Sequence, residues 1–232
     1  MLVCGRNVAK ELLNNSKKVK KIYLQEGFND KNINSLLENK NLNIKICSKK
    51  EMDNFVKEPH QGIILDIEEY HYLEFSDLVN SNPEFLVVLD HIEDPHNLGA
   101  IIRTCEAAGV DGIILPKDRQ VQVNSTVMKT SAGALVNMNL TVVTNLSNTI
   151  KKLKNSGFWI VGTALDNSVD YRSIDYSGKI ALVIGNEGKG MSQIVTKECD
   201  FIANIPMYGK INSLNASVAS GIMIYEVVRN RK

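Results

Sequence analysis

Residues 180–192 read IALVIGNEGKGMS, an apolar run of strand length that passes directly into a turn with three glycines. Similar apolar runs recur along the second part of the chain: FLVVLD (85–90), GIILP (112–116), LTVV (140–143), FWIVGTAL (158–165) and FIANIP (201–206). Short continuous runs of this kind are typical of strands buried on both faces of a parallel sheet. Helical patterns lie between them: LGAIIRTCEAAG (98–109), STVMKTSAG (125–133), SNTIKKLKNSG (147–157) and a final helix from about residue 213. The alternation predicts an open parallel α/β sheet whose ligands bind at the carboxyl ends of its strands.

The first part of the chain shows a shorter α/β pattern. Its periodicity predicts helices over 6–15, 33–39 and 49–56, and strands over 20–25, 44–48 and 62–67. Residues 68–84 lose this periodicity and end at Asn82-Pro83, which is typical of a connection between domains. We therefore expect one domain over residues 1–75, a linker over 76–84 and a second domain over 85–232.

Composition and charge set the class of protein. The 232 residues are 44% hydrophobic and 23% charged, close to the globular average, which excludes a disordered or fibrous chain. The net charge is only +1, but residues 1–57 carry twelve Lys/Arg against six Asp/Glu, including Lys17, Lys18, Lys20 and Lys21. This asymmetry favours a polyanionic partner. Charge alone is equally consistent with a solvated lysine-rich face.

The cysteines argue against metal and disulfide chemistry. Cys4, Cys47, Cys105 and Cys199 form no CxxC pair and have no histidine at ligand spacing. The beginning of the sequence lacks the apolar core of a signal peptide, and the apolar runs are too short to span a bilayer. We therefore expect a soluble cytoplasmic protein with no bound metal and no membrane association.

Three loops that follow strands collect residues that core packing does not require, at 90–100, 185–192 and 205–217. GNEGKG does not match the Walker A or dinucleotide-binding glycine patterns, and no GxSxG nucleophile turn exists. A Rossmann-type oxidoreductase, conceivable from the sheet pattern, thus lacks its glycine fingerprint. What remains is a set of Asn, Glu, Arg, Ser and backbone groups, which suits the binding and positioning of a polar substrate.

At these loops the sequence resembles the SpoU, or TrmH, branch of the SPOUT methyltransferases. The resemblance lies in DPHNLGAIIRT (94–104), IALVIGNEGKGMS (180–192) and IPMYGKINSLNASVASGIMIYEVVR (205–229), and covers about residues 85–232. VCGRNVAKELL (3–13) and HQGII (60–64) resemble the substrate-binding domain of members that modify rRNA, which is similar to ribosomal protein L30e.

The resemblance implies a C-terminal SPOUT domain with a trefoil knot, a homodimer, and methyl transfer from S-adenosylmethionine to a ribose 2′-hydroxyl of RNA. The extra N-terminal domain favours a guanosine of 23S rRNA as the substrate. A tRNA guanosine, or a non-catalytic RNA-binding role in ribosome assembly, are the alternatives. By motif, the residues implied at the cofactor are Thr163, Gly185, Ile205 and Leu214. The implied polar active-site residues are Asn97, Arg103, Glu187, Ser213 and Asn215.

Several of these residues also have plain structural interpretations. Asn97 and Ser213 each suit the N-cap of the helix that follows, and Glu187 suits the N-terminus of the next helix. Arg103 in a helix is commonly a solvated charge. In catalysis, we expect it to hold phosphate and to lower the pKa of the hydroxyl, because a guanidinium with a pKa above ~12 is a poor proton acceptor. The apolar positions Val218, Ile222 and Tyr225 of the last helix predict its burial in a homodimer.

Overall fold

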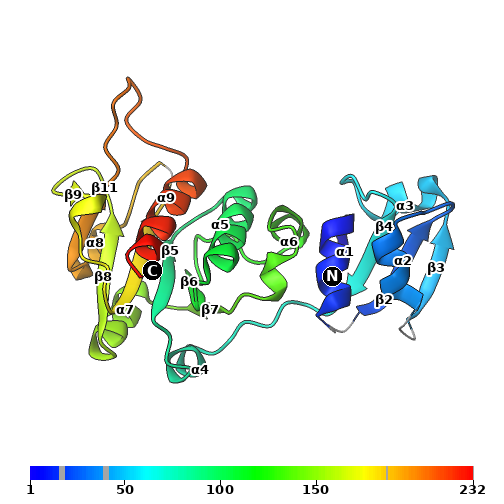
Figure 1. Ribbon diagram of the computed structural model, residues 1–232, viewed down its shortest axis with the longest axis horizontal. Coiled ribbons are helices and arrows are strands. Elements are labelled where there is room, and N and C mark those ends of the chain that lie inside the picture. Colours follow the sequence, from blue (N-terminus) through cyan, green and yellow to red (C-terminus); the bar gives the residue numbers. More distant parts are fainter. Residues whose placement is uncertain (16–18, 39–41, 187, 232) are drawn as a thin grey trace. The chain divides into compact units, whose positions relative to one another are not determined.

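The computed structural model describes residues 1–15, 19–38, 42–186 and 188–231, and the chain divides into two compact units (Figure 1). Met1–His71 and Val123–Asn137 form the first unit; Tyr72–Gln122 and Met138–Lys232 form the second. The observed division differs from the expected one in one segment: residues 123–137, expected in the second domain, pack with the first unit.

The first unit is a four-stranded sheet with the strand order β1-β4-β2-β3. Its strands are β1 (Leu2–Cys4), β2 (Val19–Gln25), β3 (Ile44–Cys47) and β4 (Ile63–Ile67), and only β2 and β3 pair in parallel. Its helices are α1 (Arg6–Asn14), α2 (Lys31–Glu38), α3 (Lys49–Phe55) and α6 (Ser125–Thr130), with a 3-10 turn at Ala134–Val136. Val8, Leu12 and Leu13 are buried on α1, as the helical spacing predicts.

The second unit is a seven-stranded sheet in which each pair of neighbouring strands is parallel, in the order β7-β6-β5-β10-β8-β11-β9. Its strands are β5 (Phe85–Asp90), β6 (Gly112–Pro116), β7 (Leu140–Val143), β8 (Phe158–Thr163), β9 (Val169–Asp170), β10 (Lys179–Gly185) and β11 (Phe201–Asn204). All six residues of β5 are buried. The predicted parallel α/β sheet is therefore confirmed, while the expected knot stays a prediction.

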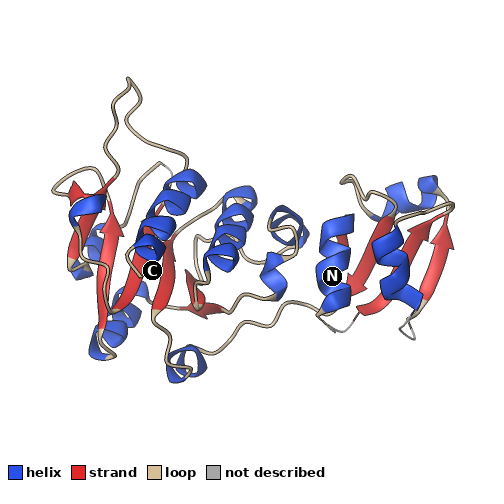
Figure 2. Ribbon diagram, in the orientation of Figure 1, coloured by secondary structure: helices blue, strands red, loops and turns tan. Residues whose placement is uncertain are grey.

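Helices cover both faces of this sheet (Figure 2). They are α4 (Phe75–Asn80), α5 (Pro95–Ala108), α7 (Leu146–Asn155), α8 (Gln193–Glu198) and α9 (Ala216–Arg229), with a 3-10 turn at Tyr171–Ser173. Side chains of α4, α7 and α8 join one core cluster with β5, β8 and β10, whereas α5 and α9 pack on each other and α9 on β10. Helix α4 begins at Phe75, the last residue of the expected first domain, and otherwise falls in the expected linker; its Leu78 is fully buried in that cluster.

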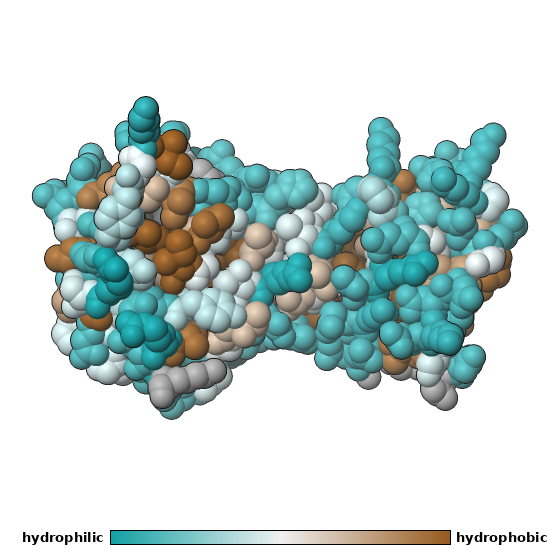
Figure 3. Space-filling view, turned by 45° about the horizontal axis from the view of Figure 1, so that its top comes forward, coloured by the Kyte–Doolittle hydropathy of each residue, from teal (hydrophilic) through white to brown (hydrophobic). Residues whose placement is uncertain are grey.

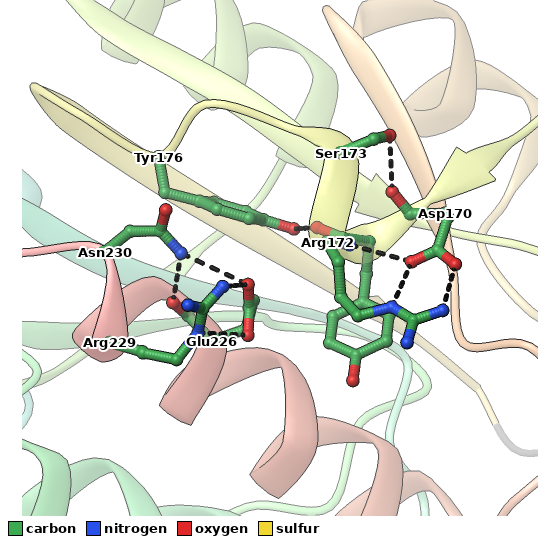
Figure 4. A network of polar contacts seen from close by, with 8 residues as sticks. Asp170, Arg172, Ser173, Tyr176, Glu226, Arg229 and Asn230 are labelled. Atoms are coloured by element: carbon green, nitrogen blue, oxygen red, sulfur yellow. Dashed lines mark hydrogen bonds and ion pairs between the residues drawn. The ribbon is translucent and has the colours of Figure 1, made fainter.

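The end of α9 lies beside the segment that follows β9 (Figure 4). Asp170 accepts hydrogen bonds from the backbone nitrogen and from Nε of Arg172, both at 2.9 Å, which holds the pKa of this carboxyl down at about 2. The buried Tyr176 donates its hydroxyl to the carbonyl of Tyr171 at 2.7 Å. On α9, Glu226 accepts from Arg229 Nε at 3.0 Å. These contacts fix the segment and the C-terminal turn of α9.

Among the helices of the described residues, none is long and apolar enough to cross a bilayer.

Candidate active site

A pocket of about 490 Å³ opens at the carboxyl ends of β8, β10 and β11 in the second unit. Three segments far apart in sequence line it together with α9: Thr163–Asp166, the turn after Ile184, and the loop from Ala203 to Leu214. Its volume lies within the ~300–1,000 Å³ of ordinary small-molecule sites. The second and third loops singled out from the sequence thus meet at one cavity.

Most residues expected to bind a ligand lie at this pocket. Thr163, Gly185, Ile205 and Leu214 all line it, and so does Ser213. The Thr163 hydroxyl donates to the carbonyl of Val183 at 3.1 Å, so this side chain links β8 to β10 at the edge of the pocket. Apolar side chains such as Met207 and Met223 complete the wall. The pocket therefore combines backbone polar groups with an apolar lining.

Gly185 is placed where no side chain fits. A Cβ on this residue would lie 2.3 Å from the nitrogen of Met191 and 2.4 Å from the carbonyl carbon of Gly190. The turn closes this tightly because Asn186 and Gly190 exchange backbone hydrogen bonds of 3.0 and 2.9 Å. A glycine at position 185 is thus required for the last residue of β10 to pass under the returning loop.

Two side chains that the sequence interpretation gave no role hold this turn. Asn186 donates Nδ2 to the carbonyl of His91 at 2.8 Å, and its Oδ1 accepts from the backbone nitrogens of Gly188 and Lys189. Asp90, fully buried, accepts at Oδ2 from the backbone nitrogen of Ser192 at 2.6 Å, and the ring of His91 lies against its Oδ1. The first loop therefore anchors the second. The only sequence signal was that both residues belong to loops already singled out.

Asn97 and Asn215 meet directly. Asn215 donates Nδ2 to Asn97 Oδ1 at 3.0 Å, and its own Oδ1 accepts from the backbone nitrogens of Ser217 and Val218. Asn215 is therefore the N-cap of α9, which begins at Ala216, and the suggestion that Ser213 caps this helix is wrong. Asp94 caps α5, so the same suggestion for Asn97 is also wrong. The nearly buried Asn97 instead faces the start of α9.

The remaining two residues of the predicted polar set are Arg103 and Glu187. Arg103 is exposed on α5 and does not line the pocket of its own chain. Glu187 lies outside the described residues, so its placement stays a prediction. Of the predicted polar set, Asn97 and Asn215 are in direct contact. Ser213, which precedes Asn215 by two residues, lines the pocket.

Burial makes two cysteine thiols of the second unit unreactive. Burial raises the pKa of Cys199 to about 12, and burial raises the pKa of Cys105 further. Neither thiol is a nucleophile near neutral pH, because only the thiolate attacks. In the described part of the chain, no group of three or more His, Cys, Asp or Glu is arranged to hold a metal ion. What the arrangement offers is positioning by amide, hydroxyl and backbone groups.

Comparison with known proteins gives two family matches. Residues 84–225 match the SpoU rRNA Methylase family, and residues 2–73 match the RNA 2′-O ribose methyltransferase substrate binding family. A putative TrmH family tRNA/rRNA methyltransferase of Staphylococcus haemolyticus is 43% identical over 239 residues, covering 100% of this chain and 96% of the relative.

Two solved structures resemble the chain to different extents. An AdoMet-bound rRNA methyltransferase from Sinorhizobium meliloti is 28% identical, with a TM-score of 0.83 over 98% of this chain and 86% of that one. A TrmH/SpoU tRNA modifying enzyme from A. aeolicus is 34% identical, with a TM-score of 0.59 over 68% of this chain and 82% of that one.

Proposed function

The chain belongs to the SpoU rRNA methylase family of S-adenosylmethionine-dependent RNA 2′-O-methyltransferases, and we propose that its substrate is a guanosine of 23S rRNA. The single observation that carries the assignment to rRNA is the first unit, which matches a substrate-binding family over residues 2–73. The rRNA methyltransferase from Sinorhizobium meliloti aligns with 98% of the chain, whereas the tRNA modifying enzyme from A. aeolicus aligns with 68%.

The pocket of the second unit fits S-adenosylmethionine. Its backbone groups near Gly185 and Leu214 suit the polar edges of an adenosine, and its apolar wall, including Met223, suits the flat base. The cofactor supplies an electrophilic methyl group, and no metal is needed to activate it. We therefore assign Thr163, Gly185, Ile205 and Leu214 to its binding.

The protein's own residues act on the ribose hydroxyl. A hydroxyl is a poor nucleophile at neutral pH, so the site must align it and ease the loss of its proton. The joined amides of Asn97 and Asn215, together with Ser213, offer fixed donors and acceptors for this alignment. Glu187 completes the proposed polar set. Arg103, as a fixed cation, holds the adjacent phosphate and favours the deprotonated hydroxyl.

The exposed face of α9 supports the proposed homodimer. Val218 and Tyr225 are each 51% exposed, and apolar side chains gather on this side of the second unit (Figure 3). Burial of such a patch against a second copy is the usual solution, most often about a two-fold axis. Because Arg103 lies outside the pocket of its own chain, the proposed dimer gives it a route to the pocket of the other copy.

The decisive experiment maps 2′-O-methyl groups in rRNA and tRNA from cells with and without this protein. We expect one guanosine methyl to disappear from 23S rRNA. Disappearance of a tRNA methyl instead would move the substrate to tRNA. No disappearance in either RNA would favour a non-catalytic role in ribosome assembly, an alternative that the Asn97–Asn215 pair disfavours. In each case the proposal places the protein in the cytoplasm.

A further inference from the structure

The first unit carries a groove of its own, about 980 Å³ in volume. It is formed by the start of α1, the loop 25–30 after β2, the turn 59–62 before β4, and two residues of α3. We propose that this groove holds one unstacked nucleotide of single-stranded RNA, with its base against the flat groups of Arg6 and Phe28. The inference rests on the proposed function, because RNA is the ligand, and it names the element of the RNA that the first unit recognises.

The turn 59–62, which lines the groove, contains a residue in a left-handed backbone conformation. Gln61 has a φ of 54°, a region that residues other than glycine enter rarely and at a cost. Two contacts with Arg6 hold it: the Arg6 backbone nitrogen donates to Gln61 Oε1 at 2.8 Å, and Arg6 Nε donates to the Gln61 carbonyl at 3.4 Å. Backbone strain kept in place in this way is concentrated at ligand sites.

The residues on either side of Gln61 complete the frame. Gly62 has a φ of 83°, and a Cβ there would lie 2.8 Å from Cδ2 of Phe28, so only glycine lets this ring pack against the turn. His60 is 5% exposed; its Nδ1 accepts from the Gly62 nitrogen at 3.0 Å and its Nε2 donates to Asp53 at 3.1 Å. The ring of Phe28 therefore stands at a fixed place in the groove.

Arg6 and Phe28 supply flat surfaces for a base. The guanidinium carbon of Arg6 lies 5.4 Å from the centre of the Phe28 ring, and the Arg6 side chain is 44% exposed. Unstacked RNA bases bind on aromatic rings and on guanidinium planes, whatever their sequence. The pairing of these two groups beside an open groove is the chemistry expected for such a base.

The charges of the groove favour a base over a run of phosphates. Three cations line it, and so do three carboxylates: Arg6, Lys10, Lys49, Glu26, Asp30 and Asp53. Asp30 lies 3.5 Å from Arg6 and 3.8 Å from Lys10, so these cations are partly neutralised. A surface of this kind offers both acceptors and donors, which the edges of bases require and a phosphate does not. A groove lined by lysines without carboxylates would instead favour binding of the RNA phosphates.

The basic cluster noted in the sequence provides a matched control. Lys17 and Lys18 lie outside the described residues, but Lys20 is exposed near the start of β2, and the groove loop begins at Gln25 at its end. Five residues of strand separate the two points by roughly 17 Å. A substitution at Lys20 therefore removes the same charge as one at Arg6, but at a residue that does not line the groove.

The test measures binding of a short fluorescein-labelled single-stranded RNA of mixed sequence to the full chain by anisotropy at one salt concentration. We expect Arg6→Ala and Phe28→Leu each to weaken binding by about 10-fold, the usual effect of losing one stacking partner. Arg6→Lys keeps the charge but loses the plane, so we expect it to behave like Arg6→Ala. Lys20→Ala changes affinity by less than about two-fold, because exposed single charges contribute little. All four variants keep their affinity for S-adenosylmethionine, because the pocket proposed for it lies in the second unit.

Two results would overturn the inference. If Arg6→Lys binds as well as the unchanged protein while Lys20→Ala loses as much as Arg6→Ala, bulk charge attracts the RNA and the groove holds no base. Unchanged binding in every variant also rules out the groove. Methyl transfer by the unchanged protein to RNA from cells that lack it is measured separately. Its failure would reject the proposed function, while the binding series would still decide the role of the groove.

Discussion

Replacing Gly185 by alanine inserts one methyl group where β10 passes under the loop that returns at Gly190 and Met191. The added Cβ would lie 2.3 Å from the nitrogen of Met191, and ordinary contact begins at 3.4 Å. The peptide between Gly190 and Met191 must therefore retreat by about 1 Å. It cannot do so freely, because the same loop is tied by Asn186 to His91 and by Ser192 to Asp90.

The size of the effect follows from this displacement. Overpacking of a rigid site costs about 1–3 kcal/mol, which lowers the unfolding temperature of a chain of this size by about 2–12 °C. Because Gly185 lines the pocket proposed for the cofactor, a shift of 1 Å there lowers kcat/KM by about 100-fold. Affinity for S-adenosylmethionine falls as well, since the wall of the pocket moves.

Calorimetry with S-adenosylmethionine, thermal unfolding and methyl transfer to RNA would be measured on the same preparations. Gly188→Ala is the matched control for packing, because its Cβ would meet nothing closer than Asn186 Oδ1 at 3.7 Å. We expect that variant to unfold at the temperature of the unchanged protein or slightly above. If Gly185→Ala unfolds at the same temperature as Gly188→Ala and binds the cofactor equally well, the steric reasoning is refuted.

Three further predictions concern other parts of the molecule. Arg103→Ala should keep binding of both RNA and S-adenosylmethionine but lose about 100- to 1,000-fold in single-turnover methyl transfer, the usual loss for one pre-organised charge; loss of RNA binding instead would contradict the catalytic role. Asp170 has its pKa lowered from 3.8 to about 2 by Arg172, so its stabilising effect is complete above pH 3.8 and disappears as the pH falls to about 2. The difference in unfolding free energy between the unchanged protein and Asp170→Asn, measured in urea, should shrink over that interval. Tyr225→Glu should convert the proposed dimer to a monomer, as measured by sedimentation. A mass of 25.8 kDa for the unchanged protein in the same measurement would rule out the dimer.

The strands of the second unit could be predicted because they are continuous apolar runs with clear ends. The predicted bounds of FLVVLD, GIILP and LTVV agree with those of β5, β6 and β7. Helices α4 and α8 were missed because each has six residues and buries one, so no periodicity develops. The sequence also could not predict that α6 packs in the first unit, because the apolar spacing of a helix does not indicate which of two hydrophobic cores its apolar face contacts.

The candidate site was predicted unevenly for a similar physical reason. Residues within one loop, such as Ser213 and Leu214, share a pocket with their neighbours in sequence, so a motif finds them together. The residues that hold the loops of that pocket in place are far apart in sequence. Asp90 accepts a hydrogen bond from the backbone of Ser192, 102 residues away, and Asn186 donates to the carbonyl of His91, 95 residues away. Pairings at such a distance are set by the order of strands in the sheet.

The return of residues 123–137 to the first unit has a consequence for the nascent chain. Val127 and Met128 are buried in that unit, where α6 contacts β1. A ribosome that has finished Met1–His71 must still make residues 72–137 before this cover exists, about 3–13 s at the usual rates of synthesis. During that interval the apolar surface beneath α6 is open to chaperones and to other nascent chains. Slower translation between residues 72 and 137 is therefore expected to lengthen the time for which this apolar surface stays uncovered.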